Sequence, residues 1–251
     1  SGQREADPTR MSGGQQQRVA IAGMLAMNPE ILVLDEPTAM LDPQGRADIM
    51  HILDELQQHG TTIILVTHHR DEFVNADRII RLDNGRIVQS ARGNTASIPE
   101  MDESGTAQED NPIAKSNIAN GASKPTSAVP IIEIHNLIYQ YPNSSKPVLD
   151  KLSITINEGE TVAITGHNGA GKTTLARLLC ALEQPQSGSI TVNTIPVARQ
   201  RANGNMQSLK RADREKLRAT IGYVMQHPER QLFAETVAED VAYGPRNQRL
   251  D

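Results

Sequence analysis

The stretch Thr161–Leu175, with the sequence TVAITGHNGAGKTTL, decides the fold of this chain. A β-branched run ends at Gly166, and a run suited to a helix opens at Lys172. The spacing between them is G-x-x-x-x-G-K-T, in which glycines let backbone N–H groups curl around an anion and the helix adds its positive N-terminal end. A chance glycine-rich turn is the alternative, but a strand before and a helix after are the context this motif requires. The stretch predicts a site for a nucleoside triphosphate, and the Rossmann fingerprint G-x-G-x-x-G is absent from it.

Each part of this loop suggests a task. Lys172 is expected to reach the β- and γ-phosphates as a point charge, and the Thr173 hydroxyl to ligate Mg²⁺. The amides between Thr165 and Thr174 are expected to hold the triphosphate tail. The other predicted phosphate-loop residues are Gly166, Asn168, Gly169, Ala170, Gly171 and Thr174.

Composition narrows the class of protein. The chain has 251 residues, 37% of them hydrophobic and 22% charged, and a formal net charge of −5, so no global positive field attracts nucleic acid. Aromatic residues make up only 2%, which argues against stacking on bases. The one cysteine, Cys180, lies among apolar residues and is expected to be a buried hydrophobe. No apolar run approaches the length of a bilayer span, so a membrane role is expected to require a partner.

A second helix start precedes a polar run of glutamines. Ser12 is a candidate N-cap, and Gly13 and Gly14 leave the first-turn N–H groups unobstructed. This geometry suits an anion, although an ordinary capped helix is the alternative.

Two apolar runs end in polar groups. Ile31–Leu34 stops at Asp35-Glu36, and a buried strand that ends in carboxylates is where open α/β sheets place ligand chemistry. Asp35 suits a Mg²⁺ shell and Glu36 suits the polarisation of water, unless both are solvated loop residues. The next run stops near His68, which is either a γ-phosphate contact or a surface imidazole.

The remaining elements follow from periodicity and turn signals. We expect helices at 43–58, 172–182 and 235–243, strands at 189–192 and 221–225, a hairpin of 78–82 with 86–89, antiparallel strands at 131–139 and 148–156, and a solvated loop and helix over 196–218. Residues 91–129 are rich in Gly, Ser, Asn, Pro and Thr, and predict a flexible linker.

Six motifs together resemble the ATP-binding domain of ABC transporters. They are the signature Met11–Gln15, the Walker B segment Ile31–Thr38, the D-loop Ala39–Asp42, the switch Val66–His68, the phosphate loop, and Gln226 of the Q-loop. The resemblance implies an α/β P-loop NTPase fold with a mainly parallel core sheet, an antiparallel β subdomain and a partial helical subdomain. It also implies ATP and Mg²⁺ as cofactors.

The resemblance assigns roles to single residues as well. Tyr141 is expected to stack on adenine, and Asp35 and Gln226 to complete the Mg²⁺ shell. Glu36 is expected to activate water and His68 to contact the γ-phosphate. Ser12, Gly13 and Gly14 are expected to close on ATP held by an opposing phosphate loop, and the implied nucleotide-binding set also includes Gln15 and Asp42.

Within the family, three segments resemble the ATPases of energy-coupling-factor importers, which take up vitamins and metal ions. These segments are 35–43, 226–233 and 236–245, and His227 departs from the Asn expected after the Q-loop Gln. This resemblance implies an integral-membrane transporter subunit, a substrate-capture subunit and a second ABC ATPase domain as partners. It implies a peripheral location on the cytoplasmic face of the cell membrane, and no nucleic acid.

The order of the motifs departs from the family. Signature, Walker B and switch come first, in residues 1–90, and the phosphate loop and Q-loop follow the 91–129 linker, in residues 130–251. The simplest interpretation is a tandem protein seen from the back half of one domain to the front half of the next, with truncation at both ends; a circular permutant is the alternative. Because buried parallel strands need neighbours on both sides, we expect the halves to dock into one domain.

Three functions fit these residues. The first is Mg²⁺-dependent ATP hydrolysis that drives transport, although this stretch by itself can be inactive. The second is a module that binds nucleotide without turnover, and the third is an ABC protein that acts on ribosomes or DNA. The lack of aromatics and of an extended basic face argues against the third.

Overall fold

The computed structural model describes residues 4–92, 129–201 and 203–248. Most of the linker predicted at 91–129 lies outside the described residues. Its first two positions, Ala91 and Arg92, belong instead to a strand.

A six-stranded sheet, ordered β11-β1-β2-β7-β3-β4, forms the centre of the fold. All neighbours pair in parallel except the last two, which form the predicted hairpin. Its strands are β1 (Ile31–Asp35), β2 (Thr62–Val66), β3 (Arg78–Asp83), β4 (Arg86–Arg92), β7 (Thr161–Thr165) and β11 (Ile221–Val224).

Strands from residues 31–92 and from residues 161–224 lie side by side in this sheet. β7 lies between β2 and β3, so that Val162 pairs with Ile64 on one side and with Arg78 on the other. β11 pairs with β1 at the opposite edge. Because a buried parallel strand must be hydrogen-bonded on both sides, residues 161–165 depend on residues 62–66 and 78–83 for their place in the core.

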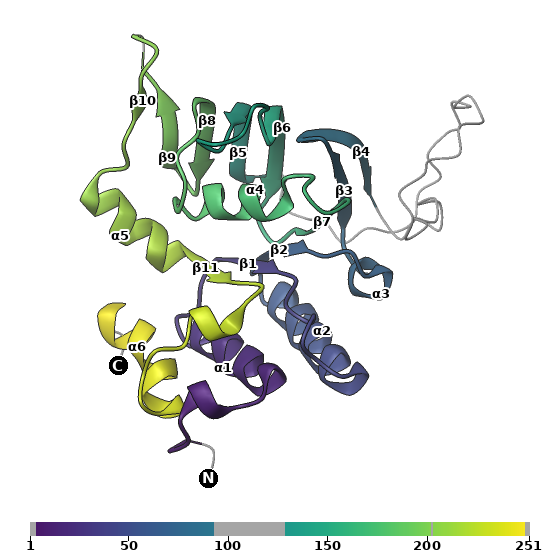
Figure 1. Cartoon of the computed structure of the whole chain (residues 1–251), viewed down its shortest axis with the longest axis vertical. Helices are drawn as coiled ribbons and strands as arrows, with labels where there is room; N and C mark the ends of the chain where they lie inside the picture. Colours follow the sequence, from purple (N-terminus) through teal and green to yellow (C-terminus); the bar gives the residue numbers. More distant parts are fainter. Residues whose placement is uncertain (1–3, 93–128, 202, 249–251) are drawn as a thin grey trace, which may run out of the picture.

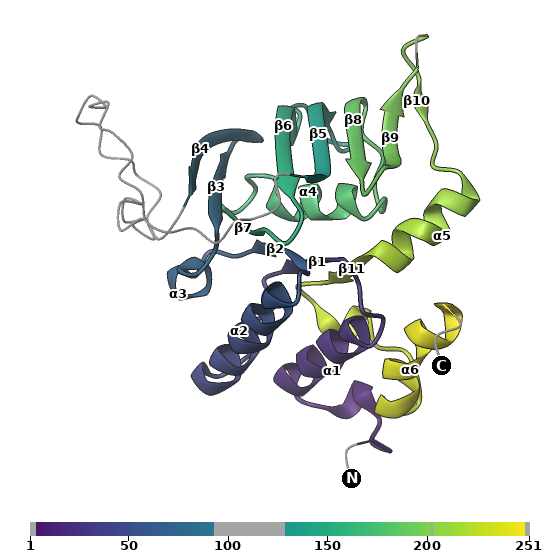
Figure 2. The ribbon, with the colours of Figure 1, turned by 180° about the vertical axis from the view of Figure 1, so that it is seen from behind.

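The two faces of the central sheet carry different layers (Figures 1 and 2). Along β1, Ile31 and Val33 pack toward α4 (Lys172–Leu179) and a second sheet, whereas Leu32 and Leu34 pack toward α1 (Gly13–Leu25) and α2 (Pro43–Gln58). This division follows from the two-residue period of a strand. The other helices are η1 (Pro8–Arg10), α3 (Arg70–Phe73), α5 (Arg211–Thr220), η2 (Pro228–Arg230) and α6 (Val237–Gln248).

The second sheet is antiparallel and five-stranded, ordered β10-β9-β8-β5-β6. The pairing of the strands expected at 131–139 and 148–156 is confirmed. The fold is thus the α/β arrangement expected, with a mixed central sheet, a separate antiparallel sheet and helices. The strands are β5 (Pro130–Tyr139), β6 (Leu149–Asn157), β8 (Ser187–Val192), β9 (Ile195–Gln200) and β10 (Met206–Gln207).

Two helix boundaries were predicted wrongly. α4 ends at Leu179 rather than 182, because Ala181 takes a left-handed φ of +53° and the Leu182 N–H bonds the Arg177 carbonyl 2.9 Å away. This is a Schellman end, with alanine where glycine is usual. α6 continues through Pro245 to Gln248, although Gly-Pro was expected to end it. Gly244 allows this part of α6 to lie close to Met27, because a Cβ added at Gly244 would be only 2.7 Å from Met27 Cγ.

The solvated loop expected from residue 196 is also wrong in part. Residues 195–200 form β9, with Val197 and Ala198 buried, and only the part from Arg211 is helical. The preceding turn has positive φ at Asn193 and Thr194, the geometry of a tight hairpin whose twist matches its strands. The high content of Arg, Asn and Gln concealed this strand, because those residues occupy its exposed face and the loop beyond it.

Candidate functional site

The phosphate loop connects β7 to α4 through left-handed glycines. Gly166, Gly169 and Gly171 have φ values of +143°, +85° and +102°. At Gly171, which is the residue before the helix, an added Cβ would lie 2.7 Å from Leu149 Cδ2 and 2.9 Å from the Val148 carbonyl oxygen. An added Cβ at Gly166 would collide with the Leu82 carbonyl oxygen. The loop therefore needs glycine for its conformation and for close approach of neighbouring backbone.

Lys172 is a buried cation at the start of α4. Its Nζ donates to the carbonyl oxygens of Gly166 at 2.8 Å and His167 at 3.1 Å, so the side chain folds back over the loop. Burial lowers the pKa of the Lys172 ammonium, while the charges of Glu36 and Asp35 act in the opposite direction. A cation in this position, next to first-turn N–H groups that have no acceptor within the helix, is suited to an anion with several oxygens.

Asp35 faces the first turn of the same helix. The Thr173 hydroxyl donates to Asp35 Oδ1 at 3.2 Å, and the Tyr223 hydroxyl to Oδ2 at 3.4 Å. Asp35 is 1% exposed, and burial raises the pKa of its carboxyl. Sequence reasoning did not select Tyr223, because a tyrosine within a strand gives no sign of which side chain it will meet.

These groups fit a magnesium ion. Mg²⁺ is usually held by one or two carboxylates together with substrate phosphates and water, and rarely by a cage of protein ligands. Asp35 accepts from two hydroxyls and keeps lone pairs for a cation, and a buried carboxylate benefits from a positive partner. Among the described residues, no cluster of three or more His, Cys, Asp or Glu side chains could hold a metal.

Glu36 lies between the predicted switch histidine and the predicted Q-loop glutamine. Its Oε1 is 3.2 Å from His68 Nδ1, and its Oε2 accepts from Gln226 Nε2 at 2.9 Å. Gln226 thus donates to Glu36, and its expected role as a metal ligand beside Asp35 and Thr173 stays a prediction. Glu36 also has a φ of +49°, a left-handed conformation that is rare for a side chain of this kind.

Tyr141 stands beside the loop, on the stretch between β5 and β6. Its hydroxyl lies 3.1 Å from Thr174 Oγ1, and its ring packs edge-to-face on Tyr139 at 4.9 Å between centroids. The ring is partly exposed. A flat aromatic surface at the rim of a phosphate site is suited to stacking on a base.

The predicted signature residues lie elsewhere. Ser12 forms a capping box with Gln15, whose side chain accepts from the Ser12 N–H at 3.0 Å. Gly14 abuts Met40, and Asp42 caps α2 by accepting from Gly45 N at 2.9 Å. Figure 1 shows α1 and α4 on opposite sides of the central sheet. The structure therefore does not bring Ser12, Gly13, Gly14, Gln15 or Asp42 to the phosphate loop of the same chain.

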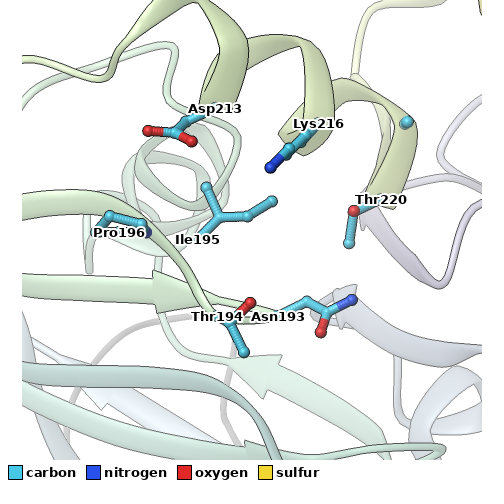
Figure 3. Close-up of a pocket in the computed structure, with 8 residues that line it drawn as sticks. Asn193, Thr194, Ile195, Pro196, Asp213, Lys216 and Thr220 are labelled. Atoms are coloured by element: carbon cyan, nitrogen blue, oxygen red, sulfur yellow. The ribbon is translucent and has the colours of Figure 1, made fainter.

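A separate surface pocket of about 370 Å³ lies between α5 and the β8–β9 turn (Figure 3). Asp213 and Lys216 of α5 stand above Asn193 and Thr194 of the turn. No residue of the phosphate loop lines it, and it brings no excess of positive charge. The charged and hydroxyl groups suited to phosphate lie instead at the carboxyl ends of β1, β2 and β7.

Comparison with known proteins shows the family of this chain. The model of the family described as "ABC transporter" matches residues 2–39 and 149–251. A protein of Bifidobacterium longum named as an ABC transporter ATP-binding protein is 50% identical over 273 residues, which cover 98% of this chain and 35% of that protein. Two further proteins with this name are each 31% identical to the chain. The one from Caldanaerobacter subterraneus matches 98% of this chain and 48% of its own length, and the one from Methanosarcina acetivorans matches 94% and 44%. The chain thus spans about a third to a half of these relatives.

Proposed function

The chain belongs to the ABC transporter family of ATP-binding proteins, and on that premise we propose that it binds and hydrolyses ATP to power transport. The observation that carries the proposal is the contact of 3.2 Å between Thr173 of the phosphate loop and Asp35 at the end of β1. A phosphate-loop hydroxyl beside a buried carboxylate is the arrangement that Mg·ATP requires.

The proposed roles follow from charge and position. Lys172 and the amides of Gly166–Thr174 bind the β- and γ-phosphates, and Tyr141 stacks on the base. Asp35 and Thr173, with Gln226 nearby, would hold Mg²⁺, which when bound neutralises phosphate charge and polarises the γ-phosphoryl group. Glu36 accepts a proton from the attacking water, and His68 orients the γ-phosphate. Most of the catalysis is positioning and electrostatic stabilisation.

We propose that a second ABC domain completes the site. Ser12 caps α1 on the far side of the sheet from α4, and Gly13 and Gly14 begin the helix. The first-turn amides of α1 can donate to an anion held by another domain. Two such domains would enclose ATP between the phosphate loop of one and the signature of the other. Gln15 and Asp42 support this face by capping α1 and α2.

We propose further that the chain corresponds to parts of two adjacent ABC domains: residues 1–90 to the back of one, 91–129 to a linker, and 130–251 to the front of the next. The support is that longer relatives match this chain over 94–98% of its length. The reading frame on both sides tests this, because a tandem protein has a phosphate loop upstream and a second signature downstream. A permutant has neither.

The transport system is proposed to be an energy-coupling-factor importer for vitamins or metal ions. An integral-membrane subunit would dock the protein at the cytoplasmic face of the membrane, and a capture subunit would select the solute. None of the helices in the described part of the chain has the length and apolar character needed to cross a bilayer. An exposed aromatic pair, Phe233 and Tyr243 with ring centroids 4.6 Å apart, lies just beyond the Q-loop and offers an apolar anchor for a partner. Co-purification with a small integral-membrane subunit tests this assignment.

A module that binds nucleotide without turnover is the second candidate. It is favoured by one observation, the separation of α1 from α4 across the central sheet, which leaves the single chain without a signature at its own phosphate loop. Binding of a fluorescent ATP analogue measured beside ATPase activity distinguishes the two. Turnover supports the enzyme, binding without turnover supports the module, and the absence of both contradicts each of them.

A further inference from the structure

Glu72 is a buried carboxylate in α3, outside the set of residues selected from the sequence. It is 2% exposed, and its two oxygens accept from two different threonine hydroxyls. Thr38 donates to Oε1, and Thr67 donates to Oε2 at 2.5 Å. Both threonines are fully buried. A buried carboxylate that accepts one hydroxyl hydrogen bond on each oxygen holds its two donors in fixed positions. Losing either hydrogen bond would leave a carboxylate oxygen in the interior without its donor, which costs free energy.

The two threonines belong to the two loops that carry Glu36, the proposed base, and His68, the proposed γ-phosphate contact. Thr38 follows Glu36 by two residues, and Thr67 directly precedes His68. The loops also meet through the backbone, where the Glu36 N–H donates to the Val66 carbonyl at 2.9 Å. Glu72 is thus the side chain that fixes the loop after β1 to the loop after β2, on either side of the 3.2 Å contact between Glu36 and His68.

Glu36 needs such support because its backbone is strained. A φ of +49° is unfavourable for a residue with a side chain, and such conformations persist only where the surroundings hold them. The Ala39 N–H returns to the Glu36 carbonyl at 3.2 Å, which makes a turn that ends beside Thr38. A bond that anchors Thr38 therefore also holds the turn in which Glu36 stands.

The charge of Glu72 has a partner on α2. Arg46 Nε lies 3.8 Å from Glu72 Oε1, and the Arg46 guanidinium also reaches the exposed Asp71 at 3.5 Å. The distance to Glu72 is that of an ion pair rather than of a close hydrogen bond. The threonine hydroxyls are therefore the groups that determine where the carboxylate lies.

We propose that Glu72 is a positioning residue, which holds Glu36 and His68 in register by joining Thr38 to Thr67. This inference rests on the proposed function, since Glu36 and His68 matter only where ATP is hydrolysed. Glu72 touches neither substrate nor the reacting atoms in this proposal, and it acts through the two loops.

The test uses the ring of His68 as a probe in the full chain without nucleotide. Histidine is labelled with ¹³C at Cε1, and the His68 resonance is assigned with His68→Gln. Thr38→Val keeps the shape of the side chain and removes only the hydroxyl that binds Glu72, whereas Thr38→Ser keeps the hydroxyl and loses a methyl group. We expect Thr38→Val and Glu72→Gln to move the His68 resonance and Thr38→Ser to restore it.

The matched variants exclude a general packing effect. If Thr38 mattered only for packing, serine would perturb His68 and valine would not, which is the reverse of the expected pattern. Asp71→Asn removes the other acidic partner of Arg46 and should leave the resonance at the wild-type position. An unchanged His68 resonance in both Thr38→Val and Glu72→Gln overturns the proposal, and Glu72→Gln supplies the answer should Thr38→Val fold poorly.

Kinetics give a second, separate readout in the assembly that hydrolyses ATP. Glu72→Gln should lower kcat by about tenfold or more, while KM for ATP changes by less than about twofold, because the bonds lost do not touch bound nucleotide. Equal kcat in wild type and variant would overturn the inference. If Mg·ATP did not protect the wild-type chain against thermal unfolding, the proposed function would be contradicted. The effect of the Thr38 and Glu72 variants on the His68 resonance would not be affected by that result.

Discussion

The hydroxyl oxygen of Thr173 lies 3.2 Å from a carboxylate oxygen of Asp35, where the first turn of α4 meets the end of β1. The two residues stand 138 positions apart in the chain. Their contact brings a phosphate-loop hydroxyl to a carboxylate, the protein group that usually holds Mg²⁺ together with substrate phosphates.

Lys172→Ala should abolish the stabilisation of the chain by Mg·ATP. The Lys172 side chain is buried at the phosphate loop, where its Nζ donates to the carbonyl oxygens of Gly166 and His167. Thermal unfolding with and without Mg·ATP measures the effect, since a ligand that binds only the folded state raises the unfolding temperature. Lys216→Ala, an exposed lysine on α5, is the control and should keep the full shift. Normal stabilisation of Lys172→Ala contradicts the assigned role.

Glu36→Gln should retain nucleotide binding and lose turnover. Glutamine keeps the size of the side chain and its contact distance to Gln226, but it cannot accept a proton from water at neutral pH. The expected loss in kcat is about 10²–10⁴-fold, the contribution typical of a general base. Steady-state ATPase assays on the hydrolysing assembly measure it, beside equilibrium binding of a fluorescent analogue. Near-normal hydrolysis would refute the assignment of Glu36.

Asp35→Asn should raise the unfolding temperature of the chain without nucleotide. Burial raises the pKa of the Asp35 carboxyl above 3.8 in the folded state, so the folded chain holds this proton more tightly than the unfolded chain. Stability is therefore lost from this group as pH rises from 3.8 through the folded pKa, and it stays lost above that pH. The gain from Asn should be larger at pH 7 than near pH 4. Asp48→Asn, which removes an exposed carboxylate that pairs with Arg18 and accepts from Gln44, is the control and should give no gain. A lower unfolding temperature at pH 7 contradicts this account.

Gly171→Ala should destabilise the fold more than Gly169→Ala. Both glycines have left-handed φ, so both changes cost about 1–2 kcal/mol of backbone strain. At Gly171 the new Cβ also meets Leu149 and the Val148 carbonyl oxygen, whereas at Gly169 it meets no atom within 4 Å. The extra cost at Gly171 is about 1–3 kcal/mol. Denaturant unfolding of both variants measures the difference in their free energies of unfolding. Equal values would contradict this prediction and show that Leu149 and Val148 move to make room for the new Cβ.

Tyr141→Ala should weaken ATP binding without weakening the binding of inorganic triphosphate. Stacking of an aromatic ring on a base contributes about 1–3 kcal/mol, which predicts a loss of about 5–150-fold for ATP. Tyr141→Phe keeps the ring and loses only the 3.1 Å contact with Thr174, so it should bind ATP nearly as wild type does. Titration calorimetry with both ligands measures these affinities. Equal losses for ATP and triphosphate would place Tyr141 at the phosphates instead of the base.

Local chemistry let the sequence predict most of the elements and the sites at their ends. The Ser12 N-cap, the Asn84-Gly85 hairpin and the spacing of the glycines before Lys172 are each visible within a few residues of sequence. Such features are encoded where they occur, so reading the chain in order finds them. The β9 strand and the continuation of α6 past Pro245 were missed, because pairing with β8 and contact with Met27 outweigh the local preference.

Burial of polar side chains could not be predicted in the same way. Asp71 and Glu72 are adjacent acids at the start of one short helix, yet the Asp71 side chain is 71% exposed and that of Glu72 only 1%. Nothing in their order distinguishes them, because the difference depends on Thr38, a hydroxyl 34 residues away. Tyr223 and Asp35 present the same problem over 188 residues.

The sequence by itself therefore determined most of the strands and helices, and it supplied the residue types from which sites for phosphate, magnesium and water are predicted. Only the tertiary structure decided that β7 lies between β2 and β3, and that Thr173 meets Asp35 while Ser12 stays on the other side of the sheet. The physical reason is range: backbone hydrogen bonds and side-chain periodicity act between near neighbours, whereas the contacts of a buried side chain are fixed by the strand order of the whole sheet.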